Sequence, residues 1–127
     1  MKEIRRLIDC EQGATVIELA FAATAFLAMI FGVINVARVA WTLGSLHYAV
    51  EAAARCASVN STSCGSASAI QTYALNAYYG ESLTGNPFTY SATGCGHTVT
   101  VTASNYSLAI PPFGTWTIPL SATACFP

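Results

Sequence analysis

The stretch ATVIELAFAATAFLAMIFGVINV, residues 14–36, determines the architecture of this chain. Its last eighteen residues, Leu19–Val36, carry no charged side chain and no proline, and Ala, Leu, Phe, Ile and Val dominate them. A helix of about this length and composition can cross a bilayer. We therefore expect a transmembrane helix over residues 14–40.

Two kinds of cleaved export signal fit this N-terminus poorly. A secretory signal has an apolar core of about 7–15 residues that ends at a small-residue cleavage site. Here the apolar core is longer, contains Glu18 near its start, and runs into Arg38 without such a site. In a lipoprotein signal an apolar core precedes the cysteine, whereas Asp9 directly precedes Cys10. An uncleaved single-pass anchor remains an open interpretation.

Charge is scarce and lies mostly at the N-terminus. Only 9% of the 127 residues are charged, the formal net charge is -1, and six of the eleven charges lie in residues 1–13. From Cys56 onward the only formal charge is Glu81. This balance provides no basic field for nucleic acid, and the low charge excludes intrinsic disorder. The basic residues of the head, residues 1–13, favour a cytoplasmic N-terminus. Arg38 and Arg55, which lie after the apolar run, weakly oppose this orientation.

The long helix is expected to continue past the apolar run to about Ser58. Apolar residues recur there at spacings of three and four, at Val39, Leu43, Leu46, Val50, Ala53 and Ala57. Such a stripe is typical of a helix with one buried face. From Ala14 to Ser58 the helix would be about 65 Å long. The remaining 72 residues, Cys56–Pro127, which we call the tail, are too few to cover a helix of this length. Lipid or other subunits must therefore cover its first half.

The tail indicates a small α+β domain. Ser66 is placed to cap a second, short helix that stops at Gly80. Three β-rich runs follow, at Phe88–Thr93, His97–Asn105 and Thr115–Ala124. Apolar and polar residues alternate in the second and third runs, which predicts half-buried antiparallel strands. The predicted fold is a long N-terminal transmembrane helix, a second short helix and a small three-stranded antiparallel sheet.

Four of the five cysteines lie in the tail, at Cys56, Cys64, Cys95 and Cys125. In a small exported domain this number indicates disulfides; reduced, buried cysteines in a cytosolic protein are the alternative. Four cysteines allow three connectivities. We predict the bridges Cys56–Cys64 and Cys95–Cys125, with Cys10 left free in the head.

The predicted Cys95–Cys125 bridge conflicts with the alternation of the strands. Placing these cysteines directly opposite one another in unbroken register would set Val99 against Ser121. A one-residue slip reverses the faces of a strand. We therefore expect a β-bulge, at Pro119.

The junction CEQGATVIEL, residues 10–19, combines three features. A short charged leader ends in Gly13, the small residue Ala14 follows, and Glu18 stands five residues after the glycine. This pattern resembles the prepilin peptidase site of type IV pilins. More narrowly, GATVIELAF, residues 13–21, is similar to the TadE-like family, the minor pseudopilins of tight-adherence pilus systems. The cysteine-rich tail is also similar to that family, which implies a pilin-like fold.

The resemblance implies roles for three residues. Prepilin peptidase would cleave between Gly13 and Ala14, and Glu18 would serve subunit assembly by pairing with the N-terminal amine of a neighbouring subunit. On composition alone, Glu18 fits equally well at the headgroup level, where it marks the end of the helix. The major pilins of these systems usually have Tyr after this acid, so Leu19 favours a minor role.

The resemblance also implies location and partners. Residues 1–13 would be a cytoplasmic leader, and residues 41–127 a periplasmic or extracellular domain that includes the helix extension. The chain would span the bacterial inner membrane once, or lie in the surface filament. Its partners would be prepilin peptidase, other pilin and pseudopilin subunits, inner-membrane pilus assembly proteins and the lipid bilayer, with no nucleic acid.

Two functions are compatible with the sequence. One is a minor pseudopilin, a structural or assembly-initiating subunit of a tight-adherence (type IVc) pilus involved in surface attachment. The other is a non-polymerising, membrane-anchored binding module, an adhesin or assembly factor. We expect no enzyme, cofactor or metal site, because His47 and His97 are isolated and the cysteine spacing does not match a zinc pattern. The tail tyrosines are expected in the core; they are Tyr73, Tyr78, Tyr79, Tyr90 and Tyr106.

Overall fold

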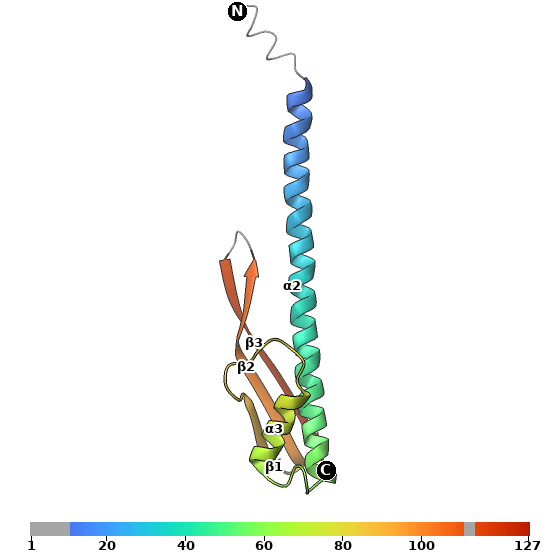
Figure 1. Cartoon of the computed structure of the whole chain (residues 1–127), viewed down its shortest axis with the longest axis vertical. Helices are drawn as coiled ribbons and strands as arrows, with labels where there is room; N and C mark the ends of the chain where they lie inside the picture. Colours follow the sequence, from blue (N-terminus) through green and yellow to red (C-terminus); the bar gives the residue numbers. More distant parts are fainter. Residues whose placement is uncertain (1–10, 111–113) are drawn as a thin grey trace, which may run out of the picture. The chain divides into compact units, whose positions relative to one another are not determined.

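The computed structural model describes residues 11–110 and 114–127. Its elements are the helices α2 (Glu11–Val59) and α3 (Ala67–Ala77) and the strands β1 (Phe88–Thr93), β2 (Gly96–Ile110) and β3 (Gly114–Phe126), shown in Figure 1. The chain divides into two compact units, Met1–Ile34 and Asn35–Pro127. The boundary between the units falls within α2.

In the first unit, α2 is an apolar helix with an exposed surface. Every residue from Thr15 to Phe31 is exposed, including Leu19 at 69% and Phe21 at 76%. The helix is long and apolar enough to cross a membrane. The hydroxyl of Thr24 donates locally to the backbone oxygen of Ala20 at 2.8 Å. The predicted long apolar helix is confirmed, and it begins at Glu11.

In the second unit, the apolar stripe predicted on α2 is confirmed. Leu46, Val50 and Ala53 are fully buried, and both ends of the stripe are partly buried. The buried face is wider than the predicted stripe, because Thr42, Ala49, Ala54 and Cys56 are buried as well. A face of this width is typical of a helix that packs on a domain core.

Helix α3 begins as predicted and ends earlier. The hydroxyl of its N-cap, Ser66, accepts a hydrogen bond from the backbone N–H of Ala69 at 3.2 Å. The helix ends at Ala77, and the extended residue Tyr78 is the C-cap. The predicted stop at Gly80 is therefore wrong. The Tyr78 hydroxyl donates to the backbone oxygen of Glu81 at 2.8 Å, which stabilises a non-helical course for this segment.

The sheet has three antiparallel strands in the order β1-β2-β3, as predicted. Strand β1 has the predicted bounds, whereas β2 and β3 are longer. Their pairing continues to Ile110 opposite Gly114. The proline-containing turn predicted between them falls on residues 111–113, outside the described part of the chain.

One face of the sheet forms the core with the two helices. Its central residues Val99, Val101, Ala103, Leu120 and Ala122 are buried. They form one cluster with Phe88 of β1, with Ile70 and Ala74 of α3, and with the buried stripe of α2. Figure 1 shows α3 and the strands beside this part of α2. Burying one face of each element in a shared core accounts for the α+β arrangement.

The predicted bulge is present, but its predicted cause is wrong. Register is unbroken from His97–Phe126 to Ala103–Leu120, which keeps Val99 opposite Ala124. Cys125 therefore lies opposite Thr98, and Cys95 reaches it from the β1–β2 turn. The irregularity falls between Ala103 and Tyr106, so the extra residue belongs to β2 and lies opposite Pro119.

Candidate assembly site

The predicted assembly residue, Glu18, is exposed on the apolar part of α2. Its neighbours Val16, Ile17 and Leu19 are 65%, 60% and 69% exposed. Glu18 forms no ion pair with any residue that the structure describes. A carboxylate on a membrane helix costs about 2.5–3.5 kcal/mol on insertion scales. A cation supplied by another molecule would reduce that cost.

The predicted cleavage position lies at the beginning of the same helix. Gly13 and Ala14 follow Glu11, where α2 begins. The side chains of residues 11–14 lie outside the described part of the chain, so the structure adds only the helical backbone here. The two predicted features, cleavage position and acid, therefore lie within the first turns of one helix.

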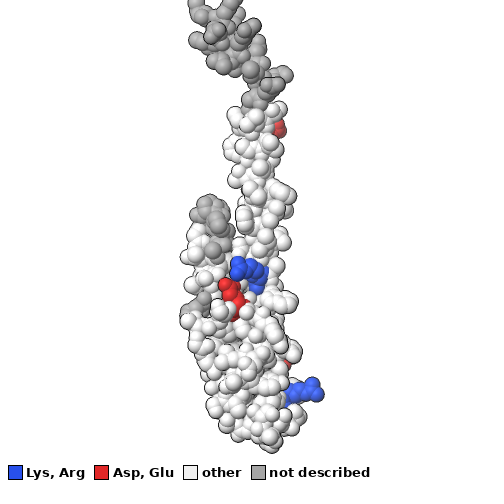
Figure 2. All heavy atoms as spheres, viewed as in Figure 1, with Lys and Arg blue, Asp and Glu red and all other residues white. Residues whose placement is uncertain are grey.

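The ion pair among the described residues belongs to the second unit. The Arg38 guanidinium donates to the Glu81 carboxylate at 3.3 Å, and the two side chains are 60% and 49% exposed. Exposed pairs of this kind contribute about 0–1 kcal/mol. Arg38 is thus engaged within its own unit. Figure 2 shows how few charged side chains this face of the molecule carries.

Two further hydrogen bonds attach the segment after α3 to α2. The indole N–H of Trp41 donates to the backbone oxygen of Tyr79 at 3.3 Å. The backbone N–H of Tyr79 donates to the Ser45 hydroxyl at 2.7 Å. We call this arrangement the collar, which comprises residues 78–81 with Arg38, Trp41 and Ser45. Sequence reasoning did not identify the collar, because its partners lie more than thirty residues apart.

Tyr78 anchors the inner side of the collar. Burial raises the pKa of its phenol above 10.0, and the negative charge of Glu81 and then Tyr106 add to the shift. The Tyr78 hydroxyl therefore stays a neutral hydrogen-bond donor to the Glu81 backbone at ordinary pH.

An exposed aromatic groove lies beside the collar. It is a hollow of about 410 Å³ lined by Ala40, Trp41, Gly44, Ser45, Tyr48 and Tyr79. A Cβ atom at Gly44 would meet nothing within 4 Å, so the groove is open at this residue. Tyr79 is 70% exposed and Tyr73 41% exposed, so the prediction that the tail tyrosines lie in the core is wrong for both. It holds for Tyr106, which is 8% exposed.

A comparison with protein families identifies the helical part of the chain. Residues 13–55 match the family described as TadE-like protein. This region is TadE-like. The match begins at Gly13 and ends directly before Cys56, so it covers the apolar run, Glu18 and the buried stripe of α2 up to Ala53. Comparisons with curated proteins and with solved structures give no match.

The family match confirms the resemblance inferred from the sequence. TadE-like proteins are pseudopilin-like proteins of Tad pilus systems, and the family is one of generally non-enzymatic structural proteins that work with the pilus machinery. Helix α3 and the sheet lie outside the matched residues. Their arrangement is known from the structure alone.

Two disulfides staple the part that follows the TadE-like region. Cys56 at the end of α2 is bonded to Cys64 with a Cα–Cα distance of 5.8 Å, and Cys95 to Cys125 with 6.4 Å. These are the two pairs expected from the sequence. The first closes the loop after α2, and the second joins the β1–β2 turn to the end of β3.

His97 lies against Tyr90 in the sheet. The Tyr90 hydroxyl lies 2.7 Å from Nδ1 of His97, and the two rings stack with centroids 5.9 Å apart. His47 is exposed on α2. Within the described residues, His, Cys, Asp and Glu form no group that could hold a metal ion.

Proposed function

We propose that this protein is a minor pseudopilin that serves as a structural or assembly-initiating subunit of a tight-adherence (type IVc) pilus and so promotes surface attachment. The observation that carries the proposal is the exposed Glu18 on an apolar helix, without an ion-pair partner among the described residues. A plain membrane anchor gains nothing from this acid, whereas a multi-subunit helix bundle can neutralise it.

The proposed assembly step follows from the position of the acid. Prepilin peptidase cleaves between Gly13 and Ala14, which frees an amine at the start of the mature helix. In the assembling filament the Glu18 carboxylate of one subunit pairs with the Ala14 amine of a neighbour. The cost of placing each charge in lipid is reduced only when both meet. Association of the inserted subunits is therefore favoured.

The proposed topology places the charged leader, residues 1–13, in the cytoplasm and residues 41–127 outside the inner membrane. The basic residues of the leader support this orientation. The two disulfides of the tail support an oxidising compartment for it. Other pilin and pseudopilin subunits and inner-membrane assembly proteins are the proposed partners.

The experiment compares Glu18→Gln with a matched variant, Glu51→Gln. Both acids are exposed on α2, but Glu51 lies in the second unit. We expect Glu18→Gln to insert in the membrane and lose its leader normally, and to reduce the pili recovered by shearing and the attached cells. Glu51→Gln should retain both. Normal pili and attachment in a cleaved Glu18→Gln strain would instead support a non-polymerising membrane-anchored binding module.

A further inference from the structure

The β2–β3 hairpin extends past the bulge as a distal hairpin, which comprises residues 106–110 and 114–118. One of its faces follows the core face of the sheet in the alternation of the strands, because Tyr106 pairs with Ile118 and Leu108 with Trp116. Burial declines along this face: Leu120 is 6% exposed, whereas Trp116 is 62% exposed. The core face therefore ends in a large apolar side chain that the second unit leaves uncovered.

The direction of the hairpin along α2 follows from its neighbours within the second unit. Phe126, at the end of β3, lines a hollow together with Val59 at the end of α2. Tyr106 lines another hollow together with Glu81, which is paired with Arg38. The hairpin thus runs from the Val59 end of this unit toward its Arg38 end, as Figure 1 also shows.

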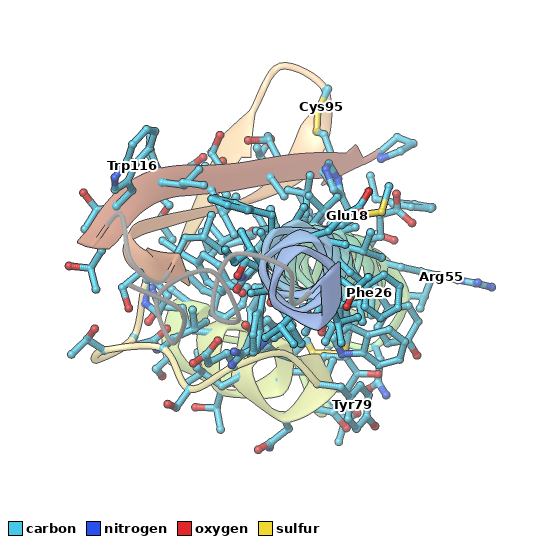
Figure 3. The ribbon with its side chains drawn as sticks, turned by 90° about the horizontal axis from the view of Figure 1, so that it is seen from above. Glu18, Phe26, Arg55, Tyr79, Cys95 and Trp116 are labelled. Atoms are coloured by element: carbon cyan, nitrogen blue, oxygen red, sulfur yellow. A yellow bond between two sulfur atoms is a disulfide. The ribbon has the colours of Figure 1, made fainter. Side chains whose placement is uncertain are left out.

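The length of β3 locates Trp116 along that direction. The stretch from Trp116 to Phe126 spans roughly 33 Å at about 3.3 Å per residue. The same length corresponds to about 22 residues of α-helix, which counted back from Val59 reaches about residue 37. That position directly follows Val36, the last residue of the uncharged run. Figure 3 shows Trp116 projecting away from α2 at the side of the domain.

Both tryptophans of the chain therefore lie at the level where the apolar run ends. Trp41 is 69% exposed on α2, and Trp116 is 62% exposed on the distal hairpin. Tryptophan is enriched at membrane–water interfaces, because its ring is apolar and its N–H is polar. Residues 82–127 contain no Lys, Arg, Asp or Glu, so no formal charge opposes contact of the hairpin with lipid.

We propose that the distal hairpin is a second membrane contact, with Trp116 at the lipid headgroup level on the same side of the bilayer as Trp41. The inference rests on the proposed single-pass insertion of α2. Lipid is the occupant that this position favours, because the uncovered face lies at the end of the domain from which the apolar run continues. Two contacts, one on α2 and one on β3, would fix the tilt of the domain on the membrane.

The test uses the full chain in phosphatidylcholine vesicles and two variants with a single tryptophan. In Trp41→Phe, we expect the emission of Trp116 to be blue-shifted and to lose intensity when lipids brominated near the headgroup are included. In Trp116→Phe, the quenching of Trp41 provides the reference depth. Emission of Trp116 that brominated lipid leaves unchanged and aqueous iodide quenches as strongly as free tryptophan would overturn the proposal.

Two further measurements distinguish lipid contact from self-association of the chain. A blue shift that depends on protein concentration and not on brominated lipid would indicate a second copy on this face and overturn the lipid contact. Trp116→Asp should shift the domain and reduce the quenching of Trp41, whereas the matched exposed variant Ser121→Asp should not. Peptide mapping of the two variants checks that each has formed the Cys95–Cys125 bridge and is therefore folded. Since no pilus is needed, failure here is distinct from failure of the assembly proposal.

Discussion

The indole N–H of Trp41 donates to the backbone oxygen of Tyr79 at 3.3 Å, which joins α2 to the segment after α3. The same peptide segment donates in the opposite direction, from the Tyr79 N–H to the Ser45 hydroxyl at 2.7 Å. Both partners on α2 lie one helical turn apart, on the side of the aromatic groove. The collar therefore holds an exposed, irregular segment in one conformation by backbone hydrogen bonds.

Removing the hydroxyl that accepts from the collar should destabilise the domain slightly. We expect Ser45→Ala to lower the free energy of unfolding by about 1 kcal/mol, because the Tyr79 N–H loses its partner. Denaturant unfolding followed by circular dichroism measures this change. Ser58→Ala is the control, since the Ser58 hydroxyl bonds only the nearby Arg55 oxygen. Equal losses in the two variants would contradict a tertiary role for Ser45.

The domain should lose stability in alkali through Tyr78. Its pKa is raised in the fold above the value of 10.0 that it has when unfolded. The neutral form is thus favoured by folding, and this stabilisation is complete below pH 10 and is lost as pH rises through the folded pKa. Unfolding measured between about pH 9 and 11 should show a falling free energy.

Tyr78→Phe should flatten that pH dependence, although it costs about 1 kcal/mol at neutral pH through loss of the hydrogen bond to Glu81. The matched control is Tyr73→Phe, because Tyr73 is exposed and on α3. If the Tyr78→Phe variant keeps the full alkaline loss of stability, another group is responsible.

The two disulfides should differ in their contribution to stability. Replacing Cys95 and Cys125 together by Ser should cost about 3–4 kcal/mol, and replacing Cys56 and Cys64 about 2–3 kcal/mol, because the first bridge closes the longer loop. Denaturant unfolding of the oxidised variants gives both values. Non-reducing peptide mapping checks the pairing, and a Cys64–Cys95 linkage would refute the strand arrangement.

Cleavage of the leader should depend on the glycine before Ala14. We expect Gly13→Val to retain residues 1–13, because a branched side chain obstructs a peptidase that accepts glycine. Intact-mass measurement of the membrane-purified protein, from cells that contain the matching peptidase, reports the loss of the leader. Gly32→Val is the control on the same helix, since a Cβ atom at Gly32 meets nothing within 4 Å. An uncleaved parent chain would refute the prediction.

Periodicity predicted the elements well where one pattern runs unbroken. The three-and-four spacing through Leu46 and Val50 located the buried face of α2, and the run of β-favouring residues located β1 to the residue. The length of β2 was missed because the bulge before Tyr106 interrupts the alternation, so the pattern ended at Asn105. An extra residue reverses the faces of all the residues that follow it, so a search for strict alternation ends the strand at the bulge.

The register of β2 against β3 and the exposure of the tyrosines depend on contacts between distant residues, which no local sequence pattern contains. The prediction assumed that bonded cysteines lie directly opposite one another, whereas Cys95 lies in a turn and bonds across it to Cys125. The exposure of Tyr79 was missed because its position depends on α2, more than thirty residues away. The candidate site followed from the sequence only as far as Gly13, Ala14 and Glu18, where the resemblance supplied the roles.

The two disulfides have a mechanical consequence for a chain held at α2 and pulled at its C-terminus. Tension that enters at Pro127 crosses from Cys125 to Cys95 through sulfur, so the backbone of β2 and most of β3 bears none of it. Tension that reaches Cys64 crosses likewise to Cys56 and enters the helix. Between Cys56 and Cys125, only the stretch from Cys64 to Cys95, which contains α3 and β1, can lengthen under load. The covalent connections thus confine stretching to about a quarter of the chain.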